Sequence, residues 1–491
     1  MPDPFNFNDF ENKVDLPKEA LEKLQCNILR STNRPRSTQI FRRFESKADF
    51  ADWFREAPRP SCSTAGESTP EGEESTLVSV LFTKAGLERL GFSDAELRGL
   101  ELDPAFLRES RDPATLEKLG DELEDFEHQT AWHVVEIYAH DAGVVINPRP
   151  SKDYVVEHGS GIKKGGGLVE GRGHASYGHF DIHDGISKVV YTQADYEKLK
   201  KPKDGQWAWD PRHELSTLLV EDPLAKSPDA YGSYFVFRKY LQDVKEYEKI
   251  LGEIAKEIDK RRKSFDASKD HEGILPPDER FGVFAGKTGA ALTELIKQWI
   301  FGRGTDGETQ IKDAAGAFIS HNDFNFDNDK DGGGCPFHAH IRKMNPRGLT
   351  GDRELEKKKT IARRGTSLVA TQVPVPNTQT TETRDAEGLL FWCAQASIED
   401  QFEFIQEKWA NSFNVDVALD PTPDVDTVIG VVDERLLKHK EPKSHWHRWK
   451  ETSDLNYGIW DAIKLVSAEY FYAPSLEGFD ALKARATGGQ S

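Results

Sequence analysis

Apolar residues recur at steps of three and four in several parts of the chain, which is the spacing of one face of a helix. This spacing predicts an amphipathic helix over residues 40–55 and a long helix over residues 241–258. Further helices are expected at 84–90, 290–301 and 398–411. Gly91 follows the first of these, at the position where a left-handed residue commonly ends a helix.

Short runs of almost continuous apolar residues predict buried strands. These runs span 76–82, 132–140, 234–237, 389–394 and 470–473. The last run is expected to close the fold, and residues 19–30 indicate a short helix that leads into a strand. Weak periodicity predicts loops over 57–75, 142–185 and 320–388. Long irregular stretches in a compact domain are usually functional.

Short strands that alternate with helices are typical of α+β folds, in which helices cover antiparallel sheets. At about 100–200 residues per domain, 491 residues suggest two to four lobes. We expect two lobes, with a boundary somewhere in residues 205–232.

The composition excludes several classes of protein. Apolar residues make up 37% of the chain, and 28 Phe, 12 Tyr and 10 Trp can fill a sizeable core, so the chain is not disordered throughout. The formal charge of −19 argues against general nucleic-acid binding and against docking on an anionic membrane. No run approaches the ~20 apolar residues that a membrane span requires.

The cysteines and the first residues of the chain favour a reducing compartment. The four cysteines are too few and too scattered for a disulfide framework, and none forms a Cys-x-x-Cys pair. Residues 1–5 show neither the basic and apolar regions of a secretory signal nor a twin arginine. The simplest expectation is a cytoplasmic protein, and the residues leave open a homo-oligomer and an unconventional export route.

Three short patterns suggest chemistry but are incomplete. The Gly-Lys-Thr sequence at 286–288 resembles the end of a phosphate-binding loop, yet the required upstream glycine is Phe281. Residues 327–332 resemble the start of a calcium-binding EF-hand loop, but its twelfth position is His338. His338 and His340 have the spacing of a metal-binding pair without an evident third ligand. A helix start, a solvated acidic turn and ordinary histidines explain these patterns more simply.

Two further segments place chemically capable side chains in loop-rich regions. Residues 178–187 contain Asp184, and residues 334–347 contain His340 and are followed by Arg363. An acid, an imidazole and a guanidinium are the groups that proton transfer and charge stabilisation require. Each of these residues is more commonly a turn former, a core hydrogen-bonding group or a solvated charge, so chemistry alone leaves both interpretations open.

The two segments resemble signatures of the dye-decolourising peroxidases. Cys-Pro-Phe-His-Ala-His-Ile-Arg-Lys-Met-Asn-Pro-Arg at 335–347 resembles their haem-binding signature, and Asp-Ile-His-Asp-Gly-Ile-Ser at 181–187 resembles their acidic GxxDG signature. Other pieces are similar to family segments in the same order, at 25–30, 231–239, 322–324, 388–391, 401–406 and 470–474. The ordered set is specific, and the chain is identified as a member of this family.

The resemblance implies two ferredoxin-like lobes, each an antiparallel sheet covered by helices. Residues 1–215 would carry the acidic loop, and residues 216–491 would bind the cofactor, haem b. His340 would be the axial ligand of the haem iron. Asp426 would accept the other ring N–H of His340.

The resemblance also implies the residues on the opposite, distal face of the haem. Asp184 would be the distal acid and base, and Arg363 the distal arginine that also contacts the haem. Leu389 and Phe391 would line this face. Because the ordinary pKa of Asp is ~3.9, an acidic optimum of activity is expected.

The activity implied is the reduction of hydrogen peroxide coupled to the oxidation of dye-like or phenolic aromatic compounds. Asp184 and Arg363 would assist heterolysis of the O–O bond, which leaves a ferryl haem. Bulky reductants would lose electrons over a distance, through radicals on surface Trp or Tyr. The tryptophan candidates are Trp207, Trp209, Trp446 and Trp449.

One departure from the family pattern concerns the acidic loop. The first glycine of GxxDG is Asp181 here, and glycine commonly provides a positive φ or a close backbone approach. A changed loop motivates an alternative function, a haem-binding or haem-handling protein with weak peroxidase turnover. A third option, an interaction protein with a vestigial pocket, conflicts with the presence of His340, Asp184 and Arg363.

Overall fold

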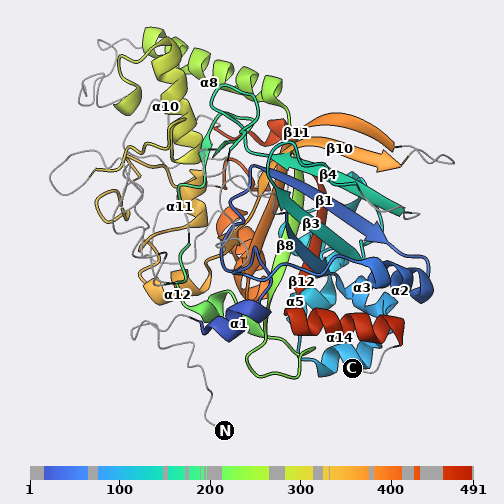
Figure 1. The fold of residues 1–491 in the computed structure, drawn as a ribbon. Helices are drawn as coiled ribbons and strands as arrows, with labels where there is room; N and C mark the ends of the chain where they lie inside the picture. Colours follow the sequence, from blue (N-terminus) through green and yellow to red (C-terminus); the bar gives the residue numbers. More distant parts are fainter. Residues whose placement is uncertain are drawn as a thin grey trace.

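Most of the apolar runs form strands of one large antiparallel sheet (Figure 1). The computed structural model describes residues 16–64, 76–147, 153–171, 176–187, 189–192, 195, 213–264, 282–312, 324–330, 332–374, 381–411, 425–431 and 457–488. Within this part of the chain the sheet has ten strands, in the order β7-β8-β12-β2-β3-β1-β4-β10-β11-β9. The fold is therefore α+β, as the alternation of strands and helices predicts.

The strands of this sheet close into a ring. In chain order they are β1 (Arg36–Arg43), β2 (Leu77–Phe82), β3 (Val134–His140), β4 (Asp153–Ser160), β7 (Val220–Glu221), β8 (Tyr231–Gln242), β9 (Ala362–Arg363), β10 (Thr366–Pro374), β11 (Thr381–Gln395) and β12 (Ile463–Ala473). β8 pairs with β12 on one side and with β11 on the other, so eight of these strands form the closed ring, and the short strands β7 and β9 pair with β8 and β11 beside it. A separate small sheet pairs β5 (Ser176–Tyr177) with β6 (His183–Asp184).

Large apolar side chains fill the inside of the ring. One buried cluster takes residues from every strand of the ring, including Phe41 of β1, Phe237 of β8, Trp392 of β11 and Phe471 of β12. The Phe41 ring lies 4.8 Å from that of Phe237 and 6.3 Å from that of Phe471, measured between centroids. Such packing makes the interior a solid core instead of a channel.

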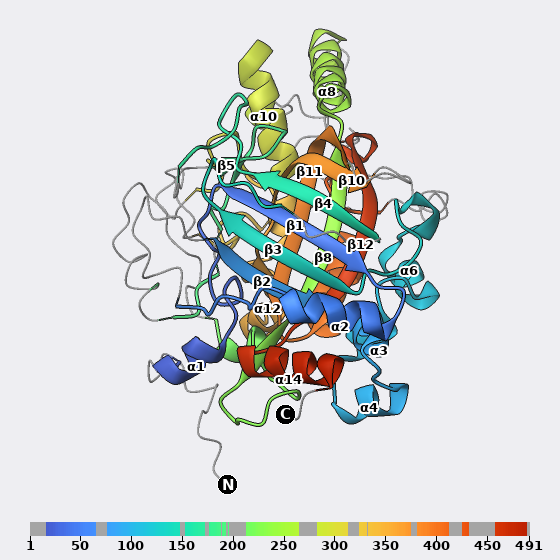
Figure 2. The same ribbon diagram turned by 45° about the vertical axis from the view of Figure 1, so that its right-hand side comes forward.

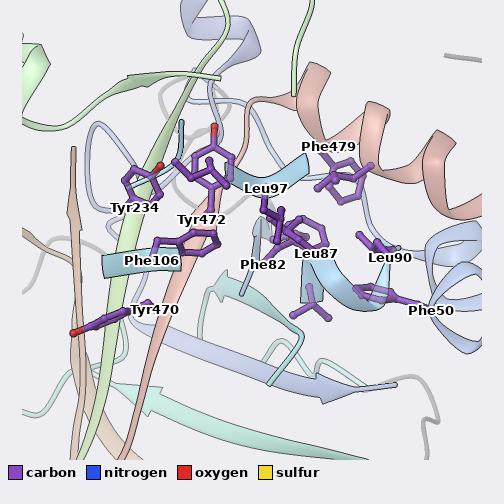
Figure 3. Packing of buried hydrophobic residues seen from close by; sticks show 14 of the residues in the cluster. Phe50, Phe82, Leu87, Leu90, Leu97, Phe106, Tyr234, Tyr470, Tyr472 and Phe479 are labelled. Atoms are coloured by element: carbon purple, nitrogen blue, oxygen red, sulfur yellow. The ribbon is translucent and has the colours of Figure 1, made fainter. Parts of the chain in front are cut away.

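Helices cover the outer face of the ring. Phe54 of α2 (Lys47–Glu56) lies 5.8 Å from Phe82 of β2 and 5.6 Å from Phe479 of α14 (Leu476–Thr487), measured between ring centroids. The two helices lie side by side against the sheet in Figure 2, and Figure 3 shows Phe50 of α2 and Phe479 of α14 on the side of Phe82 of β2, with Tyr470 and Tyr472 of β12 farther along the same buried cluster. The apolar faces of α2 and α14 are buried against the outer face of the sheet, where they form a second core.

Most of the remaining helices are short. They are α1 (Lys18–Lys23), α3 (Lys84–Arg89), α4 (Asp94–Gly99), α5 (Pro104–Arg108), α6 (Pro113–Leu119), α8 (Val244–Ser264), α10 (Gly289–Phe301), α11 (His340–Met344), α12 (Arg353–Lys358), the π-helical η5 (Ile398–Glu403) and η6 (Ile405–Ala410), and the single turns η2 (Leu123–Asp125), η3 (Leu215–Thr217), η4 (Gly282–Phe284) and η7 (Trp460–Ala462). The long helices α8 and α10 pack together beyond one end of the sheet (Figure 1). Of the helices described, none combines the length and the apolar character needed to cross a bilayer.

Several predicted elements differ from the structure. The helix expected over 40–55 is strand β1 followed by α2, because Ser46 begins a helix there with a reciprocal capping box to Asp49. The supposed loop at 142–185 contains β4, β5 and β6, and that at 320–388 contains α11, α12, β9, β10 and the first part of β11. The runs at 234–237 and 470–473 lie inside the longer strands β8 and β12, and α14 follows the second of them.

The predicted division into lobes 1–215 and 216–491 stays a prediction. Strands β1 to β4 come from the first part of the chain and β7 to β12 from the second, and both sets belong to the same sheet. The contact between them is made where β12 meets β2, through Tyr472 and Phe82, and where β10 meets β4.

Candidate active site

His340 is the first residue of α11, and its ring is held by a carboxylate. Its Nδ1 atom lies 3.0 Å from Oδ2 of Asp426. A carboxylate only accepts hydrogen bonds, so Nδ1 must carry the proton and donate it. In the neutral ring the other nitrogen, Nε2, keeps its lone pair, which is the state of a histidine that ligates a metal.

Asp426 is fully buried, and both of its carboxylate oxygens have partners. Oδ1 accepts the backbone N–H groups of Val428 and Ile429, each at 2.8 Å. Burial alone would raise the pKa of Asp426, but the His340 ring and these N–H groups outweigh burial and lower the pKa below its ordinary value. The carbonyl of Asp426 accepts the indole N–H of Trp460 at 2.9 Å, which fixes the turn that presents the carboxylate.

A buried ion pair holds the loop that precedes α11. Arg342 donates from Nη1 to Oδ2 of Asp329 at 2.8 Å. Asp329 also accepts the backbone N–H groups of Gly334 and Cys335, at 2.6 and 2.8 Å. These contacts give Asp329, within the acidic stretch, a structural role in holding this loop. Within the described ranges, no group of three or more His, Cys, Asp or Glu side chains is arranged to hold a metal ion.

Asp184 and Arg363 lie in contact although 179 positions separate them in the sequence. Nη1 of Arg363 donates to Oδ1 of Asp184 at 3.1 Å. Asp184 is on β6, and Arg363 is on β9, opposite Cys393 of β11. The two side chains are 47% and 45% exposed, so the pair is accessible to a small molecule.

Asp181 keeps the loop in the shape that a glycine would give it. Its φ is +55°, in the left-handed region that Gly favours and that Asp tolerates better than most residues. Its Oδ1 accepts the backbone N–H of Gly165 at 2.9 Å. The carboxylate of Asp181, which is three residues before Asp184 along the chain, is therefore hydrogen-bonded to Gly165.

Leu389 and Phe391 of β11 point to the same face of the sheet as Arg363 of β9. Side chains alternate along a strand, and residues directly opposite in neighbouring strands point to the same face. Cys393, the partner of Arg363, is two residues beyond Phe391, so all of these side chains lie on the outside of the ring. Leu389 and Phe391 are partly buried, whereas Leu390 points into the ring core.

The structure thus assembles the predicted residues as two pairs, His340 with Asp426 and Asp184 with Arg363. In the part of the chain that is described, no hydrogen bond or ion pair connects one pair with the other. The tryptophans proposed for electron transfer, at 207, 209, 446 and 449, lie outside the described residues, as do residues 1–5, on which the localisation prediction rests.

Two buried arginines beside the acidic loop escaped the sequence analysis. Nη2 of Arg303 and Nη2 of Arg347 lie 3.5 and 3.4 Å from Oγ of Ser187, three residues after Asp184. Burial lowers the pKa of Arg303 to about 10, and the positive charge of Arg363 adds to this effect. Arg347 has a positive φ of 50°, a strained conformation that is often kept for function.

Arg347 is the last residue of the segment that resembles the haem-binding signature, and this position in the motif could have identified it as a site residue. Arg303 follows α10 and carried no signal in the sequence. Buried cations beside a half-exposed Asp–Arg pair suit a ligand that bears carboxylates.

A cavity of about 1000 Å³ opens at another place in the fold. Lys239 and Leu241 of β8, Arg384 of β11 and Lys464 of β12 are among the residues that line it. None of the predicted site residues lines this cavity, so it is distinct from the candidate active site.

The chain is similar in sequence to known proteins over most of its length. The chain is 31% identical over 481 residues to the multifunctional dye peroxidase of an Amycolatopsis species, and the alignment covers 93% of this chain and 94% of that protein. It is 26% identical over 434 residues to a dye-decolorizing peroxidase of Mycetinis scorodonius, covering 82% and 75% of the two chains. A scan against models of protein families finds no match.

Solved structures share the fold. The DyP-type peroxidase of an Anabaena species has a TM-score of 0.67 at 23% identity, and the alignment covers 96% of this chain and 97% of that one. The Amycolatopsis enzyme has a TM-score of 0.67 at 25% identity, with the same coverage. At 31% identity over nearly all of both sequences, the Amycolatopsis relative decides the classification: this chain belongs to the dye-decolourising peroxidases and is a peroxidase of the oxidoreductase class.

Proposed function

We propose that this chain is a haem b peroxidase that reduces hydrogen peroxide and oxidises dye-like or phenolic aromatic compounds. The observation that carries the proposal is the pairing of a buried His340–Asp426 unit with an accessible Asp184–Arg363 unit. The relatives are named dye peroxidases, which supports the substrate class.

The residues present fit a haem group. His340 offers a neutral Nε2 for the iron, and Asp426 behind it increases the donor strength of the ring. Arg303 and Arg347 carry the buried positive charge that haem propionates require. When bound, haem supplies the iron chemistry that accepts two oxidising equivalents from peroxide. The finer proposal, that the half of the chain after residue 216 holds most of the haem, follows from where these four residues lie.

Asp184 is the proposed proton carrier. Hydrogen peroxide must lose a proton from one oxygen and gain one on the other before its O–O bond breaks and water leaves. A single carboxylate that reaches both oxygens performs the two transfers in turn. Asp184 stands in an ion pair with Arg363, so it is available as a base at the start of the cycle.

Arg363 stabilises the negative charge that develops on the departing oxygen. Its guanidinium is always cationic and is already oriented toward Asp184 at 3.1 Å, so little reorganisation is needed. Leu389 and Phe391 lie on the same face of the sheet and would limit the water that competes for these hydrogen bonds.

The haem-handling alternative loses its main support. That alternative depended on a loop reshaped by Asp181, yet Asp181 adopts the left-handed backbone that glycine favours. Its carboxylate accepts a hydrogen bond from the backbone N–H of Gly165, which is not a partner of Asp184.

The test is an absorption spectrum of the haem-loaded protein before and after one equivalent of hydrogen peroxide. We expect a Soret band that shifts on peroxide addition in the wild type and that keeps its position in Asp184→Asn. Asp181→Asn is the matched control, because an amide oxygen can still accept the Gly165 N–H, and it should respond as the wild type does. A pyridine haemochromogen spectrum identifies the haem type.

His340→Ala tests the axial ligand in the same experiment. Haem binding should weaken strongly, and added imidazole should restore the Soret band because it replaces the missing ring. A shift in Asp184→Asn as fast as that of the wild type would count against the proton-carrier role, and unchanged haem binding in His340→Ala would count against the ligand.

A further inference from the structure

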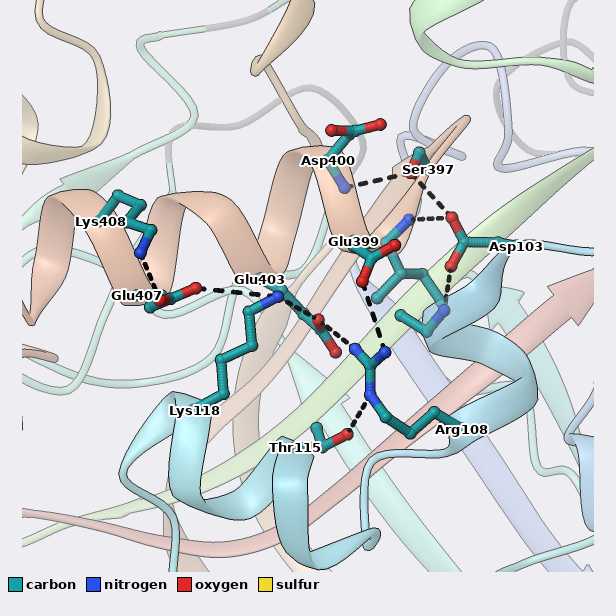
Figure 4. A network of polar contacts seen from close by, with 12 residues as sticks. Asp103, Arg108, Thr115, Lys118, Ser397, Glu399, Asp400, Glu403, Glu407 and Lys408 are labelled. Carbon is teal, nitrogen blue, oxygen red and sulfur yellow. Dashed lines mark hydrogen bonds and ion pairs between the residues drawn. The ribbon is translucent and has the colours of Figure 1, made fainter.

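Tyr470 is a buried tyrosine whose hydroxyl donates to a carboxylate. The hydroxyl of this β12 residue lies 3.0 Å from Oε1 of Glu403, which is on η5 and fully buried. The second oxygen of Glu403 accepts from Nη2 of Arg108 at 2.6 Å and from Nζ of Lys118 at 2.9 Å (Figure 4). Lys118 also lies 3.7 Å from Glu407, and both are about one quarter exposed, so the network continues from Glu403 to the surface.

The register of the sheet places Tyr470 in one row with the candidate active site. Tyr470 is opposite Val236 of β8, Val236 is opposite Cys393 of β11, and Cys393 is opposite Arg363 of β9. Residues in such a row point to the same face. At ~4.8 Å per strand, three steps place the Tyr470 backbone about 14 Å from that of Arg363.

The space along this row is filled by apolar side chains. Tyr470, Val236, Cys393 and Phe402 belong to one buried cluster, and Phe391 packs against it. Phe391 and Phe402 have their ring centroids 6.3 Å apart. Figure 3 shows Tyr470 among the residues of this cluster.

We propose that Tyr470 is a one-electron relay residue of this peroxidase, with Glu403 as its proton acceptor. The inference rests on the proposed function, because hydrogen peroxide is the source of the oxidising equivalents. It places an oxidisable side chain inside the described core, a short distance from the site where peroxide reacts.

The step balances in electrons and protons. One electron leaves the Tyr470 ring for the peroxide-oxidised haem centre, and the phenolic O–H bond breaks as the proton moves to Oε1 of Glu403. The products are a neutral tyrosyl radical and a neutral carboxylic acid. An aromatic reductant then returns one electron, and the proton moves back from Glu403 to the phenolic oxygen.

The proton acceptor is what makes oxidation of a buried phenol feasible. Burial and the charge of Glu403 keep the pKa of Tyr470 well above its ordinary value, so the phenol is protonated when the electron leaves. A cationic phenol in a low-dielectric core would be costly, and transfer of the proton over one hydrogen bond avoids that charge.

Tyr234 provides a matched control. It has the same 3% exposure as Tyr470 and lies in the same cluster. Its phenolic oxygen accepts the backbone N–H of Asp103 at 2.8 Å, a contact that offers no base for the phenolic proton.

The experiment is freeze-quench electron paramagnetic resonance of the haem-loaded protein after one equivalent of hydrogen peroxide, with the optical response recorded in parallel. We expect a tyrosyl signal in the wild type and in Tyr234→Phe, altered by ring-deuterated tyrosine, and its loss in Tyr470→Phe. Glu403→Gln keeps an oxygen that can accept the hydrogen bond but is not a base, so the signal should be lost there too.

The optical response separates the two levels of the argument. If the wild type shows no optical change with peroxide, the proposed function fails. If it shows the change but the tyrosyl signal is absent, or persists in Tyr470→Phe, only the relay assignment is overturned. A wild-type signal in Glu403→Gln overturns Glu403 as the acceptor. Haem loading and circular dichroism of each variant establish that it has folded.

Discussion

Replacing Asp426 by asparagine tests whether its carboxylate sets the tautomer of His340. Asparagine has nearly the same shape, and its Oδ1 can still accept the N–H groups of Val428 and Ile429. Its amide nitrogen would then face Nδ1 of His340, where a carboxylate oxygen now stands at 3.0 Å. Two N–H donors cannot share one hydrogen bond, so His340 should adopt the other tautomer, with its proton on Nε2.

That tautomer blocks the nitrogen proposed to bind iron. Loss of the partner behind a metal-ligating histidine commonly lowers affinity by roughly 10–100-fold, which corresponds to about 1.4–2.7 kcal/mol. We expect Asp426→Asn at the upper end of this range, because it opposes the correct tautomer. Asp426→Ala should lie at the lower end, because it removes the partner without introducing a second donor.

Haem titration followed at the Soret band measures the dissociation constant of each variant. Asp222→Asn is the control, because Asp222 is also a buried carboxylate but accepts from Tyr472 and Ser475. That variant should lose stability while its haem affinity stays unchanged. An Asp426→Asn protein that binds haem as tightly as the wild type, or more tightly than Asp426→Ala, would refute the tautomer argument.

Three further predictions concern stability and loop shape. Burial lowers the pKa of His133 to about 4 from 6.5, and its Nδ1 accepts the N–H of Phe44 at 2.9 Å. The unfolded chain therefore binds more protons than the folded chain between pH 6.5 and 4, and the free energy of unfolding in urea should fall by about 3 kcal/mol on acidification through that window. This loss should shrink in His133→Gln. Phe50→Ala removes a fully buried ring and should cost about 3–5 kcal/mol in urea unfolding, with a cost under about 1 kcal/mol arguing against a tightly packed core. Because Asp181 has a φ of +55°, Asp181→Gly should leave the peroxide reaction rate and the melting temperature nearly unchanged. Asp181→Val should lower the melting temperature, since a β-branched residue in this backbone conformation costs about 1–2 kcal/mol. Equal melting temperatures in the two variants would contradict the strained backbone.

The sequence predicted two kinds of element well: a helix with one apolar face, such as α8, and a short continuous apolar run, such as β2. The helix α8 and the strand β2 have a regular apolar pattern and were expected at nearly their observed positions. Strand β1 was mistaken for part of a helix, because Ile40 and Phe41 are both buried in a sheet packed on two faces. In such a strand the apolar residues do not alternate, so periodicity alone cannot separate it from a helix.

The ring closure could not be read from local patterns. It depends on the pairing of β8 with β11, whose residues are about 150 positions apart, such as Phe237 and Trp392. The candidate site shows the same limit: motif similarity named Asp184 and Arg363, but only the fold shows their contact. Arg303 lay outside every recognised motif, and its proximity to Ser187 appears only after the loop at 182–187 has folded.

The burial of the two carboxylates at the site differs in a way that follows from their proposed tasks. Asp426 is 0% exposed, and its fixed hydrogen bonds lower its pKa, so it stays anionic and cannot exchange its charge during a reaction. A residue that orients a metal ligand needs that constancy. Asp184 is 47% exposed and its partner Arg363 is also close to half exposed, so Asp184 is placed to take up and release a proton as peroxide arrives and water leaves. Exchanging the two environments would disable both tasks, because a buried proton carrier could not be reset by solvent and an exposed orienting group would not fix the tautomer of His340.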